Sequence, residues 1–208
     1  MSTIRLPAEE RRASLLDAAC RLFAGRSYHG TTTADLARAA GVTEPVLYRH
    51  FPSKRALYLA CMDWSWEEVK ALWADRLAAE PDPGLWLSAI GRAFVESEAE
   101  RPRSSPLWVQ ALAESSVDPE IAAYMRAHML EVHEYVADVI RRAQEAGGVP
   151  PERNPDAEAW IFIALGLLTM ADEVVGALLQ DTWPAIRESR ITWLRGPLQA
   201  SGPAPLEG

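Results

Sequence analysis

The sequence predicts an all-α fold of about nine helices. Apolar residues recur with the helical period over most of the chain, and no stretch shows the sustained alternation of apolar and polar residues that marks a strand. Short segments rich in proline and glycine separate the helical patterns. With 208 residues and 49% hydrophobic content, the chain is long enough to bury a substantial core.

The first helix is predicted from a single apolar stripe. Leu15, Leu16, Ala19, Leu22 and Phe23 recur at helical spacing. A helix with one apolar face has to bury that face against other elements. We therefore expect this helix to pack into the core of the N-terminal region.

Two short helices joined by a tight turn are predicted next. Thr32 and Asp35 have the spacing of a capping box at the start of one helix. Gly41 can take the left-handed conformation that ends it, and Thr43 is expected to cap the following helix, which accepts Pro45 in its first turn. This is the helix-turn-helix layout, in which the second helix lies in the major groove of DNA.

The second of these helices has one apolar face. Leu47 and Phe51 lie four residues apart and are expected to face the core. The side chains left to project outward or sideways are those of Glu44, Pro45, Tyr48 and Arg49. These residue types are suited to contacts in a DNA groove.

Two cations follow at the start of a fourth helix, which Ser53 is expected to cap. Lys54 and Arg55 lie in its first turn, where positive charge opposes the helix macrodipole at a cost of about 0.3–1 kcal/mol each. A DNA phosphate bound to backbone amides and Lys54 would remove this conflict. We therefore expect a phosphate contact at this helix terminus.

Charge is distributed unevenly along the chain. The net charge is −8, but residues 1–60 contain nine Lys or Arg against five Asp or Glu, which gives +4, and the remainder gives −12. A uniformly acidic protein would be repelled by nucleic acid, whereas this chain can present one basic end to a polyanion.

The segment from Asn154 predicts a helix with apolar residues on almost every side. Asn154 is its expected cap and Pro155 its first residue. Because one subunit of this size can hardly cover such a helix, we expect it to pair with the last helix, Pro184 to Leu194, in a four-helix bundle across a two-fold axis. The expected homodimer interface comprises Trp160, Ile163, Leu167, Met170, Val174, Leu178, Ile186, Ile191, Trp193 and Leu194.

The stretch "LLDAACRLFAGRSYHGTTTADLARAAGVTEPVLYRHFPSKRALYLA", Leu15 to Ala60, resembles the TetR family of bacterial transcriptional regulators. The resemblance rests on the helix-one phrase, the threonine-rich start of the second helix, the Gly-Val-Thr turn and the ending "LYRHFPSK". It covers roughly the first quarter of the chain, and beyond Trp64 only the number and placement of helices are similar.

The resemblance implies a set of DNA contacts. Thr32 and Thr33 are implied to contact phosphate, while Thr43, Glu44, Pro45 and Arg49 are implied to lie in or beside the groove. The residues implied to contact the DNA backbone or neighbouring bases are Tyr48, His50 and Lys54. Pro45 and Arg55 depart from the commonest family pattern, so base specificity cannot be transferred. A family dimer presents two reading helices, which predicts a palindromic double-stranded operator.

The resemblance also implies a small-molecule effector in the body of the protein. Eight tryptophans favour an apolar or aromatic effector, although each is individually more often a core residue. The candidate pocket residues are Trp73, Trp86, Phe94, Trp108, Tyr124, His128 and Trp160.

We expect a DNA-binding domain over residues 1–52, with the start of the fourth helix to about residue 68 attached to it. Residues 53–196 are expected to form the ligand-binding and dimerisation domain, and residues 197–208 a disordered tail. No signal core precedes residue 13, and the longest apolar run ends too early to cross a bilayer, so a soluble, cytoplasmic protein without membrane contact is predicted.

No cofactor or metal is predicted. In "HMLEVHE", His128 and Glu131 share a helical face, but His133 does not share it well. Cys20 and Cys61 lack metal spacing and fit buried, reduced thiols, although a redox role is left open.

Three functions remain in view. The first is a ligand-responsive homodimeric repressor, and the second is a DNA-binding activator or co-regulator whose body docks a protein. The third, an all-α enzyme, is disfavoured because the sequence has no GxSxG, P-loop, HExxH or dinucleotide-binding motif.

Overall fold

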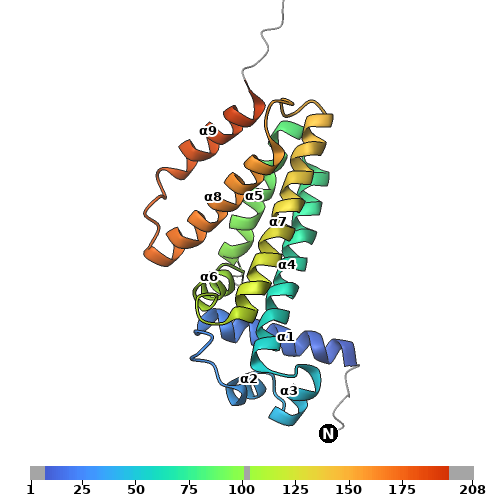
Figure 1. Cartoon of the computed structure of the whole chain (residues 1–208), viewed down its shortest axis with the longest axis vertical. Helices are drawn as coiled ribbons and strands as arrows, with labels where there is room; N and C mark the ends of the chain where they lie inside the picture. The colour runs from blue at the N-terminus through green and yellow to red at the C-terminus, as the bar shows by residue number, and fades with distance from the viewer. Residues whose placement is uncertain (1–7, 101–103, 197–208) are drawn as a thin grey trace, which may run out of the picture. The chain divides into compact units, whose positions relative to one another are not determined.

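The computed structural model describes residues 8–100 and 104–196, and in these ranges all regular structure is helical. The helices are α1 (Ala8–Gly25), α2 (Thr33–Ala39), α3 (Glu44–His50), α4 (Lys54–Ala79), η1 (Pro83–Leu85, a short 3-10 helix), α5 (Trp86–Glu100), α6 (Ser104–Glu114), α7 (Pro119–Glu145), α8 (Pro155–Val175) and α9 (Trp183–Arg195) (Figure 1). The all-α prediction is confirmed. The expected disordered tail, residues 197–208, lies outside the described ranges. No described helix combines the length and apolarity needed to cross a membrane.

The helices group into two compact units. The first comprises Met1–Asp75 and Ala93–Leu130, and the second comprises Arg76–Arg92 and Glu131–Gly208. The long helices α4, α5 and α7 contribute to both units, so this grouping differs from the domain boundary expected near residue 52. The physical reason is that α4, α6 and the start of α7 share one buried core with α1, α2 and α3.

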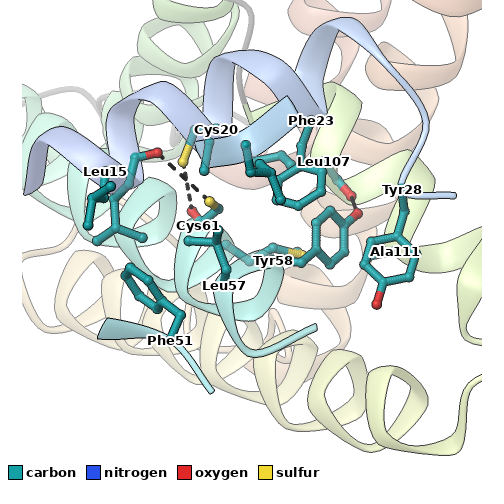
Figure 2. Close-up of a cluster of buried hydrophobic side chains, with 14 of the residues drawn as sticks. Leu15, Cys20, Phe23, Tyr28, Phe51, Leu57, Tyr58, Cys61, Leu107 and Ala111 are labelled. Atoms are coloured by element: carbon teal, nitrogen blue, oxygen red, sulfur yellow. Dashed lines mark hydrogen bonds between the residues drawn. The ribbon is translucent and has the colours of Figure 1, made fainter. Parts of the chain in front are cut away.

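Aromatic rings lie at the centre of the first unit's core (Figure 2). Phe23 of α1 meets Tyr58 of α4 edge to face, with ring centroids 5.0 Å apart. The buried Tyr58 hydroxyl donates to the Leu107 carbonyl of α6 at 2.8 Å, and burial raises the pKa of this phenol. The predicted apolar stripe of α1 is confirmed, since Leu15 is 1% exposed and Phe23 is fully buried.

Cys20 of α1 and Cys61 of α4 lie across the same helix contact, as Figure 2 shows. The Cys20 thiol points at the Cys61 carbonyl, with 3.9 Å between Sγ and O, and the Cys61 thiol points at the Leu16 carbonyl at the same distance. Both cysteines are fully buried, and burial raises the pKa of the Cys61 thiol. A raised thiol pKa lowers the fraction of the thiol present as thiolate, the reactive form.

In the second unit, α8 and α9 form an antiparallel hairpin. As predicted, Asn154 caps α8, since its Oδ1 accepts the amides of Asp156 at 2.9 Å and Ala157 at 3.1 Å. The buried Glu158 carboxylate near the start of α8 accepts the indole N–H of Trp193 near the end of α9 at 2.7 Å.

A second bond of the same kind closes the opposite end of this hairpin. The buried Asp172 carboxylate, in the last turn of α8, accepts the indole N–H of Trp183, the first residue of α9, at 3.1 Å. Glu158 also pairs with Arg190 of α9. Charge-assisted hydrogen bonds therefore hold α9 to α8 at both ends.

Candidate nucleic-acid interface

The capping box predicted at the start of α2 is present. The Thr32 hydroxyl accepts the Asp35 amide at 3.1 Å, and the Asp35 carboxylate accepts the Thr32 amide at 3.3 Å. Hydrogen bonds from the Thr32 side chain and backbone lower the pKa of Asp35. At the other end, Gly41 has φ of +65°, the left-handed conformation that the sequence predicted for the turn. The turn therefore rests on bonds and conformations that are local in sequence.

α3 presents the outward face that the sequence predicted. Leu47 and Phe51 are each 3% exposed and anchor the helix in the core. Pro45, Tyr48 and Arg49 are exposed, with Tyr48 at 45%.

The two ends of α3 differ in their surroundings. Thr43 occupies the N-cap position as predicted, but its side chain makes no capping hydrogen bond. His50 is half-buried, in the last turn of the helix.

A side-chain bond between α2 and α3 was not predicted. The Thr33 hydroxyl donates to the Glu44 carboxylate, with 2.7 Å between Oγ1 and Oε2. Thr33 is the first residue of α2 and Glu44 the first of α3. Two residues that the family resemblance assigned separately to phosphate and groove contacts are thus bonded to each other.

Ser53 caps α4 as predicted, since its hydroxyl accepts the Ala56 amide at 3.0 Å. The Lys54 ammonium donates to the carbonyls of Tyr28 at 2.9 Å and Thr31 at 3.1 Å. It also lies 4.3 Å from the centroid of the Tyr28 ring. The chain thus supplies acceptors of its own for the Lys54 ammonium, and the phosphate contact expected at this helix terminus stays a prediction. No local pattern predicts these acceptors, because they lie 23 and 26 residues from Lys54 along the chain.

Arg55 joins the start of α4 to the start of α7. Its guanidinium donates to Asp118 at 2.8 Å and to Glu120 at 2.6 Å. Asp118 also accepts the amides of Glu120 at 2.9 Å and Ile121 at 3.2 Å, and so caps α7. The hydrogen bond from Arg55 holds the pKa of Asp118 below its ordinary value, and the same bond raises the pKa of Arg55.

Two further polar contacts connect α6 with the end of α1 and the loop after it. The Gln110 amide donates to the carbonyls of Phe23 at 2.9 Å and Arg26 at 3.1 Å. The His29 ring lies 2.7 Å from the Glu114 carboxylate. α6 and the start of α7 are thereby fastened to the elements that carry the helix-turn-helix.

Four of the candidate pocket residues meet in one aromatic cluster in the first unit. His128 is 4% exposed, and its ring lies 5.0 Å from Trp108 and 5.7 Å from Tyr124, measured between centroids. Trp66 bridges His128, at 5.6 Å, and Trp73, at 5.5 Å. Trp66 was not a candidate, although its spacing of seven from Trp73 places both on one face of α4.

The remaining pocket candidates are not part of this cluster. Trp86 belongs to the second unit, where its indole donates to the Glu80 carbonyl at 3.0 Å. Trp160 also belongs to the second unit, where its ring lies against that of His133 in a tilted arrangement, with centroids 4.6 Å apart. Phe94 is half-buried on α5 and has no ring contact within the described residues.

The expected dimer residues fall into three groups. Trp160, Val174, Leu178 and Trp193 are exposed, with Leu178 at 77%. Leu167, Ile186 and Ile191 are half-buried. Three others are buried within the subunit and cannot form a contact surface without rearrangement: Ile163, Met170 and Leu194.

Three exposed apolar residues of α8 were not among the expected dimer residues, namely Ile161, Leu168 and Val175. Together with the exposed Ala164 and Ala171 they follow one another at alternating spacings of three and four residues. This spacing places them on one face of the helix. The apolar residues around α8 thus divide into a buried face and this exposed stripe.

Comparison with known families covers both parts of the chain. Residues 15–61 match the family described as bacterial regulatory proteins, tetR family. Residues 83–186 match the family described as BetI-type transcriptional repressor, C-terminal.

Individual relatives align over most of the chain. The HTH-type transcriptional activator FasR of Mycolicibacterium smegmatis is 28% identical over 90% of this chain and 80% of its own length. The HTH-type transcriptional regulator UidR of Escherichia coli is 25% identical over 83% of this chain and 86% of its own. A transcriptional regulator from Saccharomonospora viridis, solved in complex with choline, has the same fold, with a TM-score of 0.72 and 22% identity over 88% of this chain and 94% of its own.

Proposed function

Because this chain belongs to the TetR family of bacterial transcriptional regulators, which bind DNA and are not enzymes, we propose that it is a homodimeric repressor with a palindromic operator. A small molecule bound in its body releases the operator. The site of action is the cytoplasm, where the operator lies. The DNA-binding domain is residues 1–52 with the start of α4, and residues 53–196 carry the effector site and the dimer contact.

The observation that carries DNA reading is the two-sided character of α3. Leu47 and Phe51 anchor one face in the core, so the opposite face, with Pro45, Tyr48 and Arg49, is held outward on a rigid support. Arg49 has the donor geometry for guanine, and Tyr48 can contact the backbone. Thr32, Thr43 and His50 flank this face along the chain.

The exposed stripe of α8 supports a dimer. A soluble subunit rarely leaves a continuous row of large apolar side chains in water, and Ile161, Leu168 and Val175 form such a row with two alanines between them. The occupant we propose is the same stripe of a second copy, because a two-fold interface is self-complementary and the small residues let the helices approach closely. Trp160, Val174 and Leu178 extend the same surface.

The aromatic cluster around His128 supports an effector site. Electron-rich ring faces bind aromatic or apolar molecules, and they also bind organic cations such as quaternary ammonium groups. The choline complex of the Saccharomonospora viridis regulator makes the second class worth testing. We propose an aromatic molecule or an organic cation with apolar substituents as the effector, and we expect Trp108, Tyr124 and His128 to contact it.

An activator is the second candidate, and the similarity to the activator FasR favours it. In this reading the DNA-binding head and the dimer are unchanged, and the effector or a protein partner stabilises the bound state. The two candidates differ in how the effector changes operator affinity: it lowers the affinity of a repressor and raises that of an activator.

The decisive experiment is selection of bound sequences from a random duplex pool with the purified protein. An enriched inverted repeat supports a two-fold DNA-reading dimer, and no enrichment contradicts the proposal. The selected operator is then titrated with aromatic compounds and with choline. Release identifies a repressor, and tighter binding identifies an activator. Trp108→Ala should abolish the response and leave operator affinity unchanged, whereas Trp86→Ala, outside the cluster, should leave both unchanged.

A further inference from the structure

The carboxylate of Glu44 is fixed at the edge of the exposed face of α3. Its Oε2 accepts the Thr33 hydroxyl at 2.7 Å, a bond between the first residues of the two helices of the motif. Glu44 is half-buried, and it has no ion pair among the described residues. The other carboxylate on α2 and α3, that of Asp35, already accepts hydrogen bonds from Thr32 and Arg38. Glu44 is therefore the acid on these two helices that is oriented but not neutralised.

The chemistry of a carboxylate limits what it can contact in a major groove. It has acceptor atoms and no donor, and here the Thr33 proton occupies one oxygen, which leaves Oε1 for an external donor. Base edges in the major groove offer two such donors, the N4 amino group of cytosine and the N6 amino group of adenine. The O6 and N7 atoms of guanine and the O4 atom of thymine are acceptors, and they repel it.

We propose that Glu44, positioned by Thr33, determines specificity by selecting a base with an exocyclic amino group, cytosine or adenine, at one position of each half-site. This inference rests on the proposed DNA-reading function. Thr33 is then a positioning residue rather than the phosphate contact that the family resemblance implied. The negative charge of the carboxylate also repels DNA phosphates. A docked position that brings a phosphate close to Glu44 therefore has a lower affinity.

A purely structural role for the hydrogen bond between Thr33 and Glu44 predicts a different result. If the bond only fastens α2 to α3, its loss lowers the stability of the head and weakens binding to all sequences alike. If Thr33 contacts phosphate, its loss weakens all binding and reduces the salt dependence of binding. Only a role in base selection changes the ranking of bases at one position.

The test compares base preferences selected by the wild type and by Glu44→Gln, Glu44→Ala, Thr33→Val and Thr33→Ser. Glu67→Gln, an exposed acid on α4 paired with Lys70, is the control variant. Thermal unfolding of each variant confirms that the head is folded. Selection from a random duplex pool is read position by position, so that an altered preference is separable from a general loss of affinity.

The wild type should enrich cytosine or adenine at one position of each half-site. Glu44→Ala should flatten the preference there by about fivefold or more. Glu44→Gln should shift it towards adenine, because an amide pairs with both N6 and N7. Thr33→Val should weaken the preference at the same position, and Thr33→Ser, which keeps the hydroxyl, should restore it.

An unchanged preference in Glu44→Ala, with the wild type still selecting an operator, overturns this inference and leaves the proposed function intact. A uniform loss of affinity and of salt dependence in Thr33→Val assigns Thr33 to phosphate and also overturns it. If the wild type itself selects no sequence, the proposed function is what fails.

Discussion

Arg55, in the first turn of α4, donates to Asp118, the residue that caps α7, across 2.8 Å. The pair joins α4, which follows the helix-turn-helix, to α7. The Asp118 carboxylate also caps the first turn of α7. Asp118 is therefore hydrogen-bonded to the start of α4 and to the first turn of α7, which both belong to the first unit.

The first prediction concerns the pH dependence of this pair. Arg55 lowers the folded-state pKa of Asp118, so the stabilisation is present above the ordinary carboxyl pKa of about 4 and is lost as the pH falls through the folded value. Asp118→Asn keeps an oxygen that can cap α7 and removes the charge. The melting temperature of the variant should be lower than that of the wild type at pH 7, and the two should converge below about pH 4. A constant difference between the two proteins at all pH values would contradict a charge-based contribution.

The second prediction concerns Lys54. Lys54→Met removes the donor to the Tyr28 and Thr31 carbonyls, and the free energy of unfolding should fall by about 1–3 kcal/mol. Urea unfolding measures this loss, and Arg126→Met, an exposed cation on α7, is the control that should change it little. We expect the salt dependence of operator binding to change little, because the ammonium is held by the protein. Unchanged stability together with a flatter salt dependence would instead assign Lys54 to a DNA phosphate.

The third prediction concerns Arg49, which is exposed on α3. Arg49→Ala should weaken operator binding by about 1–3 kcal/mol if the side chain is bidentate to guanine, and it should relax the preference at one base position. Competition binding with single-base operator variants measures both effects. If all single-base variants keep their wild-type ranking, Arg49 is not a base-reading residue.

The fourth prediction concerns the exposed stripe of α8. Leu168→Glu places an unpaired carboxylate in the proposed dimer contact and should raise the dimer dissociation constant at least about tenfold. Leu130→Glu, on α7 and 54% exposed, is the matched control and should leave the dimer intact. Sedimentation velocity over a concentration series distinguishes these results. A Leu168→Glu protein that dimerises like the wild type would place the two-fold contact elsewhere.

The fifth prediction concerns the hairpin of α8 and α9. Trp193→Phe keeps a ring but removes the N–H that Glu158 accepts, which should cost about 1–3 kcal/mol of unfolding free energy because the carboxylate is buried. Trp183→Phe should act similarly at the other end through Asp172. Trp160→Phe should cost less, because the Trp160 ring contacts the His133 ring and this variant keeps a ring there. Equal losses in all three variants would point to ring packing and not to the indole hydrogen bonds.

Sequence by itself determined the features that depend on neighbours along the chain. The capping box of Thr32 and Asp35, the left-handed Gly41 and the Asn154 cap are all present, because each involves residues within a few positions of one another. The outward face of α3 followed for the same reason, since helical periodicity fixes which side chains oppose Leu47.

Only the tertiary structure decided which distant groups satisfy these local elements. It placed the Tyr28 and Thr31 carbonyls next to the Lys54 ammonium, and it divided the apolar surface of α8 into a buried face and an exposed stripe. It also bonded Thr33 to Glu44 and Arg55 to Asp118. Such pairings depend on how helices pack in three dimensions, and neither periodicity nor capping patterns specify which residues of two separate helices meet.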